Sequence, residues 1–268
     1  MDEAASIAAA LGDRTLLANC RRNQGVTLLD RGDEARVAAL LDEALSTYRE
    51  AGHAVGAALT RVNLAQLARR YGRVDEALGH LDAAEALFAE AGSRWGAAMV
   101  LTERGVIFHE AGALDRAEAA LSAACSRYAV IGGVNAPLAT LSLARVHLAR
   151  GRVDEARAAL AGLLDRFAAQ KRHGRALLTV LALLEVAAVQ RDWALWDEQL
   201  EVARGLLTQL DLHTRDGARL AEDAAARAEA AGDEARAVAA WQLAHAQWQA
   251  LGARVELGRV AARLGLSG

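Results

Sequence analysis

Small and large apolar positions recur along this chain with a period of about 40 residues, and glycines mark each period. One set of glycines is Gly12, Gly52, Gly92, Gly132 and Gly252; an interleaved set is Gly32, Gly72, Gly112, Gly151 and Gly232, with Arg191 at the missing place. Segments of helical composition separate them, and glycine suits the left-handed residue that follows a helix. The pattern predicts a repeated unit of helix A, a tight turn, helix B and a second turn.

The start of each predicted helix B is acidic. The residues are Asp33, Asp75, Asp115, Asp154 and Asp233, each one to three positions after a glycine of the second set. Carboxylates in the first turn interact favourably with the helix dipole. These residues therefore support a helix start after each A–B turn.

Four positions, counted from the residue at each A–B turn, define the expected packing. Seven before it the residue is small in five of six repeats, and five and twelve after it alanine dominates. Nine after it the residue is always large and apolar: Leu41, Leu81, Leu121, Leu160, Leu200 and Trp241. Small residues let two helices approach closely, and the large residue fills the space beside them. A fixed period of this length predicts a solenoid of helix pairs.

This pattern resembles the tetratricopeptide repeat (TPR) superfamily over nearly the whole chain. The shared features are the small–small contact, the Gly-Asp or Gly-Arg turn, the Asp-Glu-Ala start of helix B and the large residue four positions after that alanine. The usual TPR unit has about 34 residues and commonly ends in proline, whereas this unit is longer and the chain has 1 proline. Long units of this kind look like those of bacterial regulators; the proline and packing signature of HEAT-type repeats is missing.

The resemblance implies an all-α protein, a right-handed α-solenoid of antiparallel helix pairs with about six full repeats plus terminal capping helices, fourteen helices in all. We expect one superhelical domain over residues 1–268. Its parts are a partial repeat or N-terminal cap at 1–12, repeats at 13–52, 53–92, 93–132, 133–172, 173–212 and 213–252, and a capping helix at 253–268. A start inside a repeat fits either a capped natural protein or a domain excised from a larger regulator.

Composition agrees with a helical, cytoplasmic protein. The chain is 53% hydrophobic and 4% aromatic, and Lys171 is its only lysine, as expected of a G+C-rich and therefore bacterial genome. The longest apolar run, 176–189, contains Thr179 and Glu185 and is too short to predict a membrane span. Cys20 and Cys125 are too few for a disulfide framework. The net charge of −3 argues against a general polyanion binder.

Motifs for catalysis are missing from the sequence: it has no phosphate-binding loop, no dinucleotide fingerprint, no HExxH and no GxSxG. His109 and Glu110 have no second histidine at ligand spacing. We therefore expect no enzyme, no cofactor and no metal. Trp193 and Trp196 lie at the turn of a degenerate fifth repeat, where they either anchor a partner or, as we favour, fill space left by that repeat. Trp241 and Trp248 are interpreted as core on the same grounds.

Helix A of each TPR-like pair is expected to line the concave side. Positions thirteen, ten, six, three and two before the turn residue share one side of the helix, which we call the A-helix face. Candidate groove residues on it are Asn19, Arg22, Val62, Gln66, Arg69, Arg70, Thr102, Val106, His109, Leu141, Arg145, Leu181 and Glu185. Two interpretations stay open: some of these residues are core between A helices, or they form a groove with apolar pockets and polar groups for a peptide backbone or carboxylate.

The function we predict is a non-catalytic protein- or peptide-binding scaffold, a bacterial regulatory or adaptor module that holds an extended peptide or a helix in the groove. Alternatives are the sensor fragment of a larger transcription regulator or signalling ATPase, a self-assembling array, an unfamiliar enzyme, and a nucleic-acid-binding repeat that uses Arg21, Arg22, Arg61, Arg69 and Arg70. No membrane partner is expected, and the oligomeric state stays open.

Charges on the A-helix face predict an orientation for the ligand. Repeats one and two carry Arg22, Arg69 and Arg70 against Asp30, and repeats five and six carry Arg219 against Glu185, Glu222 and Glu229. We expect the acidic or C-terminal end of a peptide to lie toward Arg69 and Arg70, and its basic end toward Glu185 and Glu222.

Overall fold

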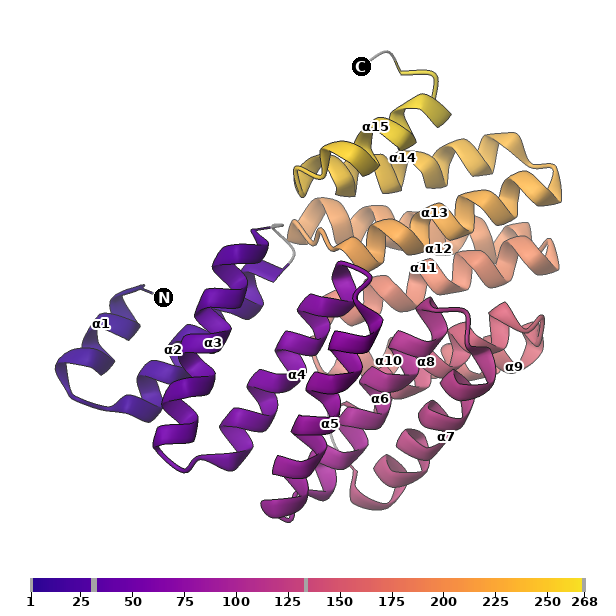
Figure 1. The fold of residues 1–268 in the computed structure, drawn as a ribbon. Helices are drawn as coiled ribbons and strands as arrows, with labels where there is room; N and C mark the ends of the chain where they lie inside the picture. Colours follow the sequence, from indigo (N-terminus) through magenta and orange to yellow (C-terminus); the bar gives the residue numbers. More distant parts are fainter. Residues whose placement is uncertain (1, 30–32, 133–134, 267–268) are drawn as a thin grey trace. The chain divides into compact units, whose positions relative to one another are not determined.

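A computed structural model describes residues 2–29, 33–132 and 135–266 (Figure 1). These residues form fifteen helices and no strand. The helices are α1 (Asp2–Ala10), α2 (Arg14–Leu28), α3 (Glu34–Glu50), α4 (Ala54–Arg70), α5 (Val74–Glu90), α6 (Arg94–Glu110), α7 (Leu114–Ile131), α8 (Ala136–Ala149), α9 (Val153–Ala161), α10 (Leu163–Ala169), α11 (His173–Gln190), α12 (Trp193–Leu210), α13 (Arg215–Ala231), α14 (Glu234–Ala250) and α15 (Arg254–Arg263).

This is the expected all-α solenoid of helix pairs, with α2, α4, α6, α8, α11 and α13 as A helices. One difference concerns the fourth helix B, which we expected to be continuous. Gly162 ends α9 and separates it from α10, so the described residues hold one helix more than the fourteen predicted. Glycine loses more conformational freedom in a helix than any other residue, which makes the break cheap at this point.

The turns follow the glycine pattern. Among the described members of both sets, every glycine has a positive φ, between 63° and 86°; Gly32 lies outside the described residues. Arg191 adopts the same left-handed conformation, with φ of 55°, although its Cβ makes that conformation less favourable than for glycine. The predicted turn role of both sets is therefore confirmed wherever the structure describes it.

The predicted packing positions form the core. All six residues nine after the turn are buried, and so are all six residues five after it. The close approach of helices A and B is visible at Gly105, where an added Cβ would lie 2.4 Å from Cγ of Leu121. Gly25 and Leu41 form the equivalent contact two repeats earlier. A Cβ added to Gly25 would lie 3.0 Å from Cδ2 of Leu41.

A further core position was not predicted. Sixteen residues after each turn lies a large buried side chain: Tyr48, Phe88, Tyr128, Phe167, Leu207 and Trp248. In two repeats its ring lies against a glycine in the first turn of the next helix A. A Cβ on Gly56 would come within 2.5 Å of Tyr48, and one on Gly96 within 2.2 Å of Phe88.

The described helices group into two compact units, residues 1–142 and 143–268. In the first unit each helix from α1 to α6 packs on the next one along the chain. In the second unit α11 is central: it contacts α9, α10, α12 and α13, and its residues Ala176–Ala188 are all buried. The expectation of one continuous domain stays a prediction.

α11 is also the one described helix that is long and apolar enough to cross a membrane. Length and composition alone give this result, and 72% of the segment is buried inside the protein. A core helix passes the same test, and the packing of α11 on four other helices fits that interpretation.

The tryptophans of the second unit are mostly core, as expected. Trp196 is fully buried and contacts Trp193 edge to face, with 6.1 Å between ring centroids. Trp241 and Trp248 are buried too, and their indole N–H groups donate to Glu229 at 2.7 Å and Glu222 at 2.6 Å. These two rings therefore fill the core and also hold carboxylates of α13.

Candidate ligand-binding face

The A-helix face of the first unit begins on α2 with Asn19 and Arg22. Both side chains are half-buried. The hydroxyl of Tyr48, from α3, donates to Oδ1 of Asn19 at 2.7 Å, and Arg22 donates to Oδ1 of Asn23 at 3.3 Å. Asn19 thus has a structural role in joining helix A to its own helix B, besides any contact with a ligand.

Polar contacts link α4 to α6 along this face. Nε2 of Gln66 donates to Oε1 of Glu103 at 2.8 Å, and the guanidinium of Arg69 is paired with the carboxylate of Glu110. Glu103 is buried. These contacts join side chains about one repeat apart, so the polar groups of neighbouring A helices fix each other's positions.

Glu103 is a residue that the sequence analysis missed. It lies nine positions before its turn, one position away from Thr102 in the predicted stripe. Its charge and the burial of Tyr128 act together: burial raises the pKa of that phenol to about 12, with Thr102 and Glu103 close to the hydroxyl. The carboxylate of Glu103 and the phenol of Tyr128 are thus two buried polar groups close to the A-helix face of α6.

Five of the predicted residues are buried, namely Glu185, which is described below, and four others. Val62, Thr102, Leu141 and Leu181 are at most 2% exposed, because neighbouring helices cover that part of helix A. These four side chains belong to the core. The remaining apolar candidate, Val106, is half-buried, as are Arg70 and His109, so the exposed part of the face is more polar than predicted.

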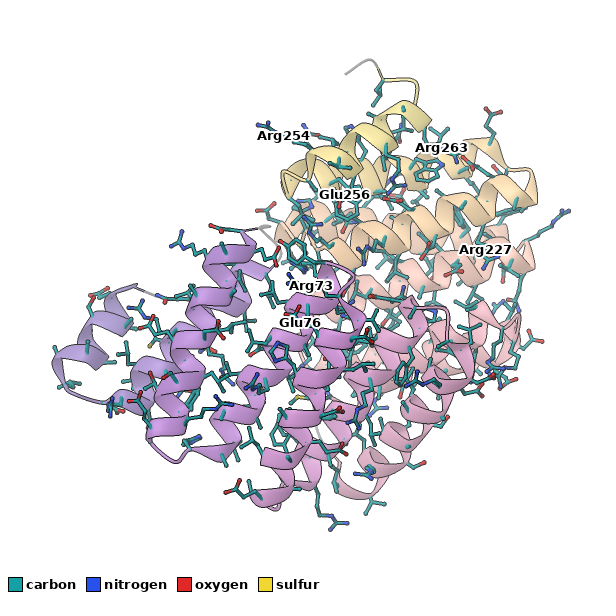
Figure 2. The ribbon with its side chains drawn as sticks, in the orientation of Figure 1. Arg73, Glu76, Arg227, Arg254, Glu256 and Arg263 are labelled. Carbon is teal, nitrogen blue, oxygen red and sulfur yellow. The ribbon has the colours of Figure 1, made fainter. Side chains whose placement is uncertain are left out.

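In the second unit the A-helix face centres on Glu185 of α11. Its side chain is buried, and Nε of Arg227 on α13 donates to its Oε1 at 3.2 Å (Arg227 is labelled in Figure 2). Burial raises the pKa of this carboxyl, and the charge of Asp223 acts in the same direction, against Arg227 and Arg145. Burial also raises the pKa of Asp223, which Arg145 opposes. Glu185, Arg145, Asp223 and Arg227 therefore form one interacting charge cluster from α8, α11 and α13.

The predicted charge difference between the two ends of the chain is largely neutralised. Glu222 pairs with Arg259 at 2.6 Å, and Glu229 lies 3.7 Å from Arg263 (labelled in Figure 2). These arginines lie on α15, whose side chains the sequence analysis did not count. Arg69 is likewise balanced by Glu110, and Asp30 lies outside the described residues.

Across the described ranges, no group of three or more His, Cys, Asp and Glu side chains is placed to hold a metal ion. Cys20 and Cys125 are half-buried free thiols, and burial raises the pKa of Cys125. A raised pKa disfavours the reactive thiolate.

No family model matches this chain, and no curated protein is similar to it in sequence. Solved structures are similar. A Rap protein complexed with Competence and Sporulation Factor has a TM-score of 0.72 at 16% identity, over 90% of this chain and 66% of that one. The Rap conjugation gene regulator of plasmid pLS20, in complex with the Phr* peptide, has a TM-score of 0.70 at 16% identity, over 95% of this chain and 66% of that one.

PilF of Pseudomonas aeruginosa has a TM-score of 0.54 at 15% identity, over 93% of this chain and 99% of its own. In contrast, the chain spans about two thirds of the length of the two Rap proteins. These likenesses, together with the helix pairs and their glycine turns, show that the fold is a helical repeat of the TPR type.

Proposed function

We propose that this protein is a non-catalytic scaffold that binds an extended peptide or a helix on its A-helix face, in a bacterial regulatory or adaptor role in the cytoplasm. The proposal rests mainly on the polar links between successive A helices. Gln66–Glu103 and Arg69–Glu110 join α4 to α6, and Glu185–Arg227 joins α11 to α13.

Such links hold amide, carboxylate and guanidinium groups at the spacing of the repeat. Groups that are fixed before binding lose less conformational entropy when a ligand arrives. Amides pair with a peptide backbone, and guanidinium groups pair with carboxylates in two-pronged contacts. The A-helix face therefore offers a peptide several ordered polar contacts in a row.

The structural neighbours support this choice. One Rap structure contains the Phr* peptide and another contains Competence and Sporulation Factor. If this chain uses its fold in the same manner, a peptide is the ligand class to test first.

Contacts within the protein weigh against nucleic acid as the partner. Arg21 is paired with Glu43 at 3.1 Å, Arg69 is paired with Glu110, and Arg61 contacts His80 at 3.0 Å. Arg22 donates to Asn23, and Arg70 also interacts within the protein, so all five arginines that motivated that alternative have protein contacts. Phosphate binding needs several uncommitted cations at once.

The proposal can be tested with peptides selected from a display library against the full chain. A photo-crosslinking amino acid is placed at Val26 or Val189, which are exposed positions on the A-helix face, or at Ser122 or Val202, which are exposed positions on the B helices α7 and α12. We expect a selected peptide to crosslink at Val26 or at Val189, and at neither Ser122 nor Val202.

A second measurement uses a charge change on the same face. Arg70→Glu should weaken binding of an acidic selected peptide at least about tenfold, which corresponds to about 1.4 kcal/mol, while Arg36→Glu on α3 should leave affinity unchanged. Arg69 is left unchanged in this test, because reversal there breaks the pair with Glu110. Crosslinks confined to Ser122 and Val202, or a failure to enrich any peptide, would overturn the proposal.

A further inference from the structure

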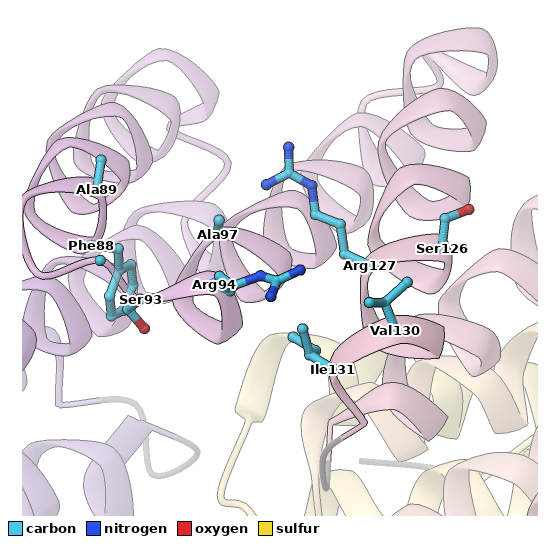
Figure 3. A pocket seen from close by; sticks show the side chains of 10 residues that line it. Phe88, Ala89, Ser93, Arg94, Ala97, Ser126, Arg127, Val130 and Ile131 are labelled. Carbon is cyan, nitrogen blue, oxygen red and sulfur yellow. The ribbon is translucent and has the colours of Figure 1, made fainter.

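An apolar hollow of about 570 Å³ lies in the first unit, away from the A-helix face (Figure 3). It is formed by the end of α5, the start of α6 and the last turns of α7. Its lining residues are Phe88, Ala89, Gly92, Ser93, Arg94, Ala97, Ser126, Arg127, Val130 and Ile131. The volume is within the range of sites that hold small organic molecules.

The charges at this hollow are of one sign. Arg94 and Arg127 are its two charged lining residues, and no carboxylate lines it. Figure 3 shows Arg94 extending from α6 toward Arg127, Val130 and Ile131 of α7. Within the described parts of the chain, neither guanidinium has an ion pair, whereas Arg14, Arg73 and Arg104 do. Two cations therefore lie over an apolar floor without an anion.

The first repeat shows what is missing. Two periods earlier, Arg14 stands at the position of Arg94, and Nη2 of Arg14 lies 2.5 Å from Oε2 of Glu50. The position of Glu50 is occupied in the third repeat by Val130, and that of Thr47 by Arg127. Equivalent backbone positions thus hold a neutral Arg–Glu pair in the first repeat. In the third repeat they hold two arginines and Val130, which is 75% exposed.

We propose that this hollow binds a small apolar monocarboxylic acid, with its carboxylate between Arg94 and Arg127, where the carboxylate of Glu50 lies in the first repeat. The apolar body of the acid packs on Ala97 and Ile131 and covers Val130. Guanidinium groups bind a carboxylate with short, charge-assisted hydrogen bonds. Removal of exposed apolar surface from water supplies the rest of the affinity.

A small molecule fits these observations better than a protein surface does. The lining comes from one joint between neighbouring repeats, and its two cations match a single carboxylate. A protein partner would be expected to use a larger area than one such hollow provides. The site also shares no residue with the A-helix face, so it can be occupied while that face holds a peptide.

The test is a calorimetric titration of the full chain with decanoate, 3-phenylpropionate and indole-3-acetate, each compared with the alcohol of the same skeleton and with acetate. We expect at least one of the three acids to bind at least tenfold more tightly than its alcohol and than acetate. Arg94→Gln and Arg127→Gln should each weaken that acid at least fivefold and leave the alcohol unchanged.

Val130→Glu is the most specific variant, because it restores in the third repeat the carboxylate of Glu50. It should abolish the preference for acid over alcohol while keeping the fold, since the position is exposed. Arg14→Gln is the matched control: it alters the equivalent arginine, which already has Glu50 as partner, and should leave acid binding unchanged.

Three outcomes would overturn the proposal. None of the acids binds better than its alcohol; or the preference survives in Val130→Glu and in both arginine variants; or only peptides with a free apolar C-terminal residue bind in an Arg94-dependent manner, which would make the site one for a protein terminus. Peptide crosslinking at Val26 and Val189 is an independent measurement. A negative result in the acid titrations therefore does not contradict the proposed scaffold function.

Discussion

Leu121 illustrates at the residue scale how little room separates helices A and B. A Cβ on Gly105 would lie 2.4 Å from its Cγ. Leu121→Ala should cost about 2–5 kcal/mol of unfolding free energy, because it leaves a cavity in a fully buried joint. Gly105→Ala should cost about 1–3 kcal/mol by overpacking. In the double variant the new methyl group enters the space vacated by the leucine, so we expect less than the sum.

Denaturant unfolding of the three variants measures these costs. Arg36→Ala, on the exposed side of α3, is the control and should stay within about 0.5 kcal/mol of the parent protein. Equal effects of Arg36→Ala and Leu121→Ala would show that the repeat phase is misassigned. Strict additivity at positions 105 and 121 would show that the two residues do not compete for the same space.

Glu185 gives the second prediction, on pH. The pKa of its carboxyl is raised from 4.5 in the folded protein, first by burial and then by Asp223. The folded state therefore keeps this proton at a pH at which the unfolded chain has released it, so its contribution to stability is full below about pH 4.5 and is lost as the pH rises through the folded pKa. Glu185→Gln stays neutral, and its oxygen can still accept from Arg227.

The thermal midpoint of Glu185→Gln minus that of the parent protein should thus increase as the pH is raised from about 4.5 toward neutrality. Thermal melts followed by circular dichroism at several pH values measure it. Glu198→Gln, exposed on α12, should show no such trend. A difference that is independent of pH, or that decreases as pH rises, would contradict the raised pKa.

What the sequence predicts at this scale depends on the kind of contact. Leu41, Leu81 and Leu121 were predictable because a close joint between two helices needs a large apolar group at one phase of the helix. Partners of charged side chains were not. Arg227 reaches Glu185 from a position outside the predicted stripe, since a long flexible side chain can pair across several helix phases.

Gly162 is the informative feature at the scale of elements. It has φ of −85° and ψ of −1°, a conformation open to alanine, and an added Cβ would meet no atom within 4 Å. Gly162→Ala should therefore extend α9 toward α10 and stabilise the protein by about 0.5–1 kcal/mol. Gly151→Ala should instead destabilise it, because φ there is 75°.

Far-ultraviolet circular dichroism and denaturant unfolding of both variants test this prediction. Gly79→Ala is a matched control in an open, continuous helix, α5, and should be stabilising to a similar extent. If Gly162→Ala destabilises the chain while Gly79→Ala does not, the break at Gly162 is required by the packing of α10.

Helix bounds were predictable because glycine marked almost every turn, and the left-handed conformation of those glycines confirms the physical reason. The break at Gly162 was not, since this glycine is out of phase with both sets. The buried position sixteen residues after each turn, occupied by residues such as Tyr48 and Trp248, was not predicted because four residue types occur there. Its common property is volume at one position, which a search for identical residues does not detect.

On the scale of the whole molecule, the two compact units make a prediction about cooperativity. In a protein built of helical repeats, each repeat contacts only the neighbouring repeats, so the effect of a mutation on stability decays along the chain. Leu121→Ala should accelerate amide hydrogen exchange within residues 1–142 and leave α11 to α14 nearly unchanged. Leu181→Ala should do the reverse.

Hydrogen exchange followed by mass spectrometry resolves the two regions in one experiment. Protection of the buried helix α11 is the internal reference in the first variant, and protection of α4 is the reference in the second. Equal acceleration in both regions by either variant would show that residues 1–268 unfold as one cooperative domain, as the sequence pattern led us to expect.

The aromatic positions give the chain a built-in pair of optical reporters. All three tyrosines, Tyr48, Tyr71 and Tyr128, belong to residues 1–142, whereas four of the five tryptophans, Trp193, Trp196, Trp241 and Trp248, belong to residues 143–268. Indole emission therefore reports mainly on the second unit. Trp95, which contacts Phe88 edge to face, is the single tryptophan of the first unit. In Trp95→Phe, fluorescence excited at wavelengths that tryptophan absorbs and tyrosine does not would therefore report on the second unit alone.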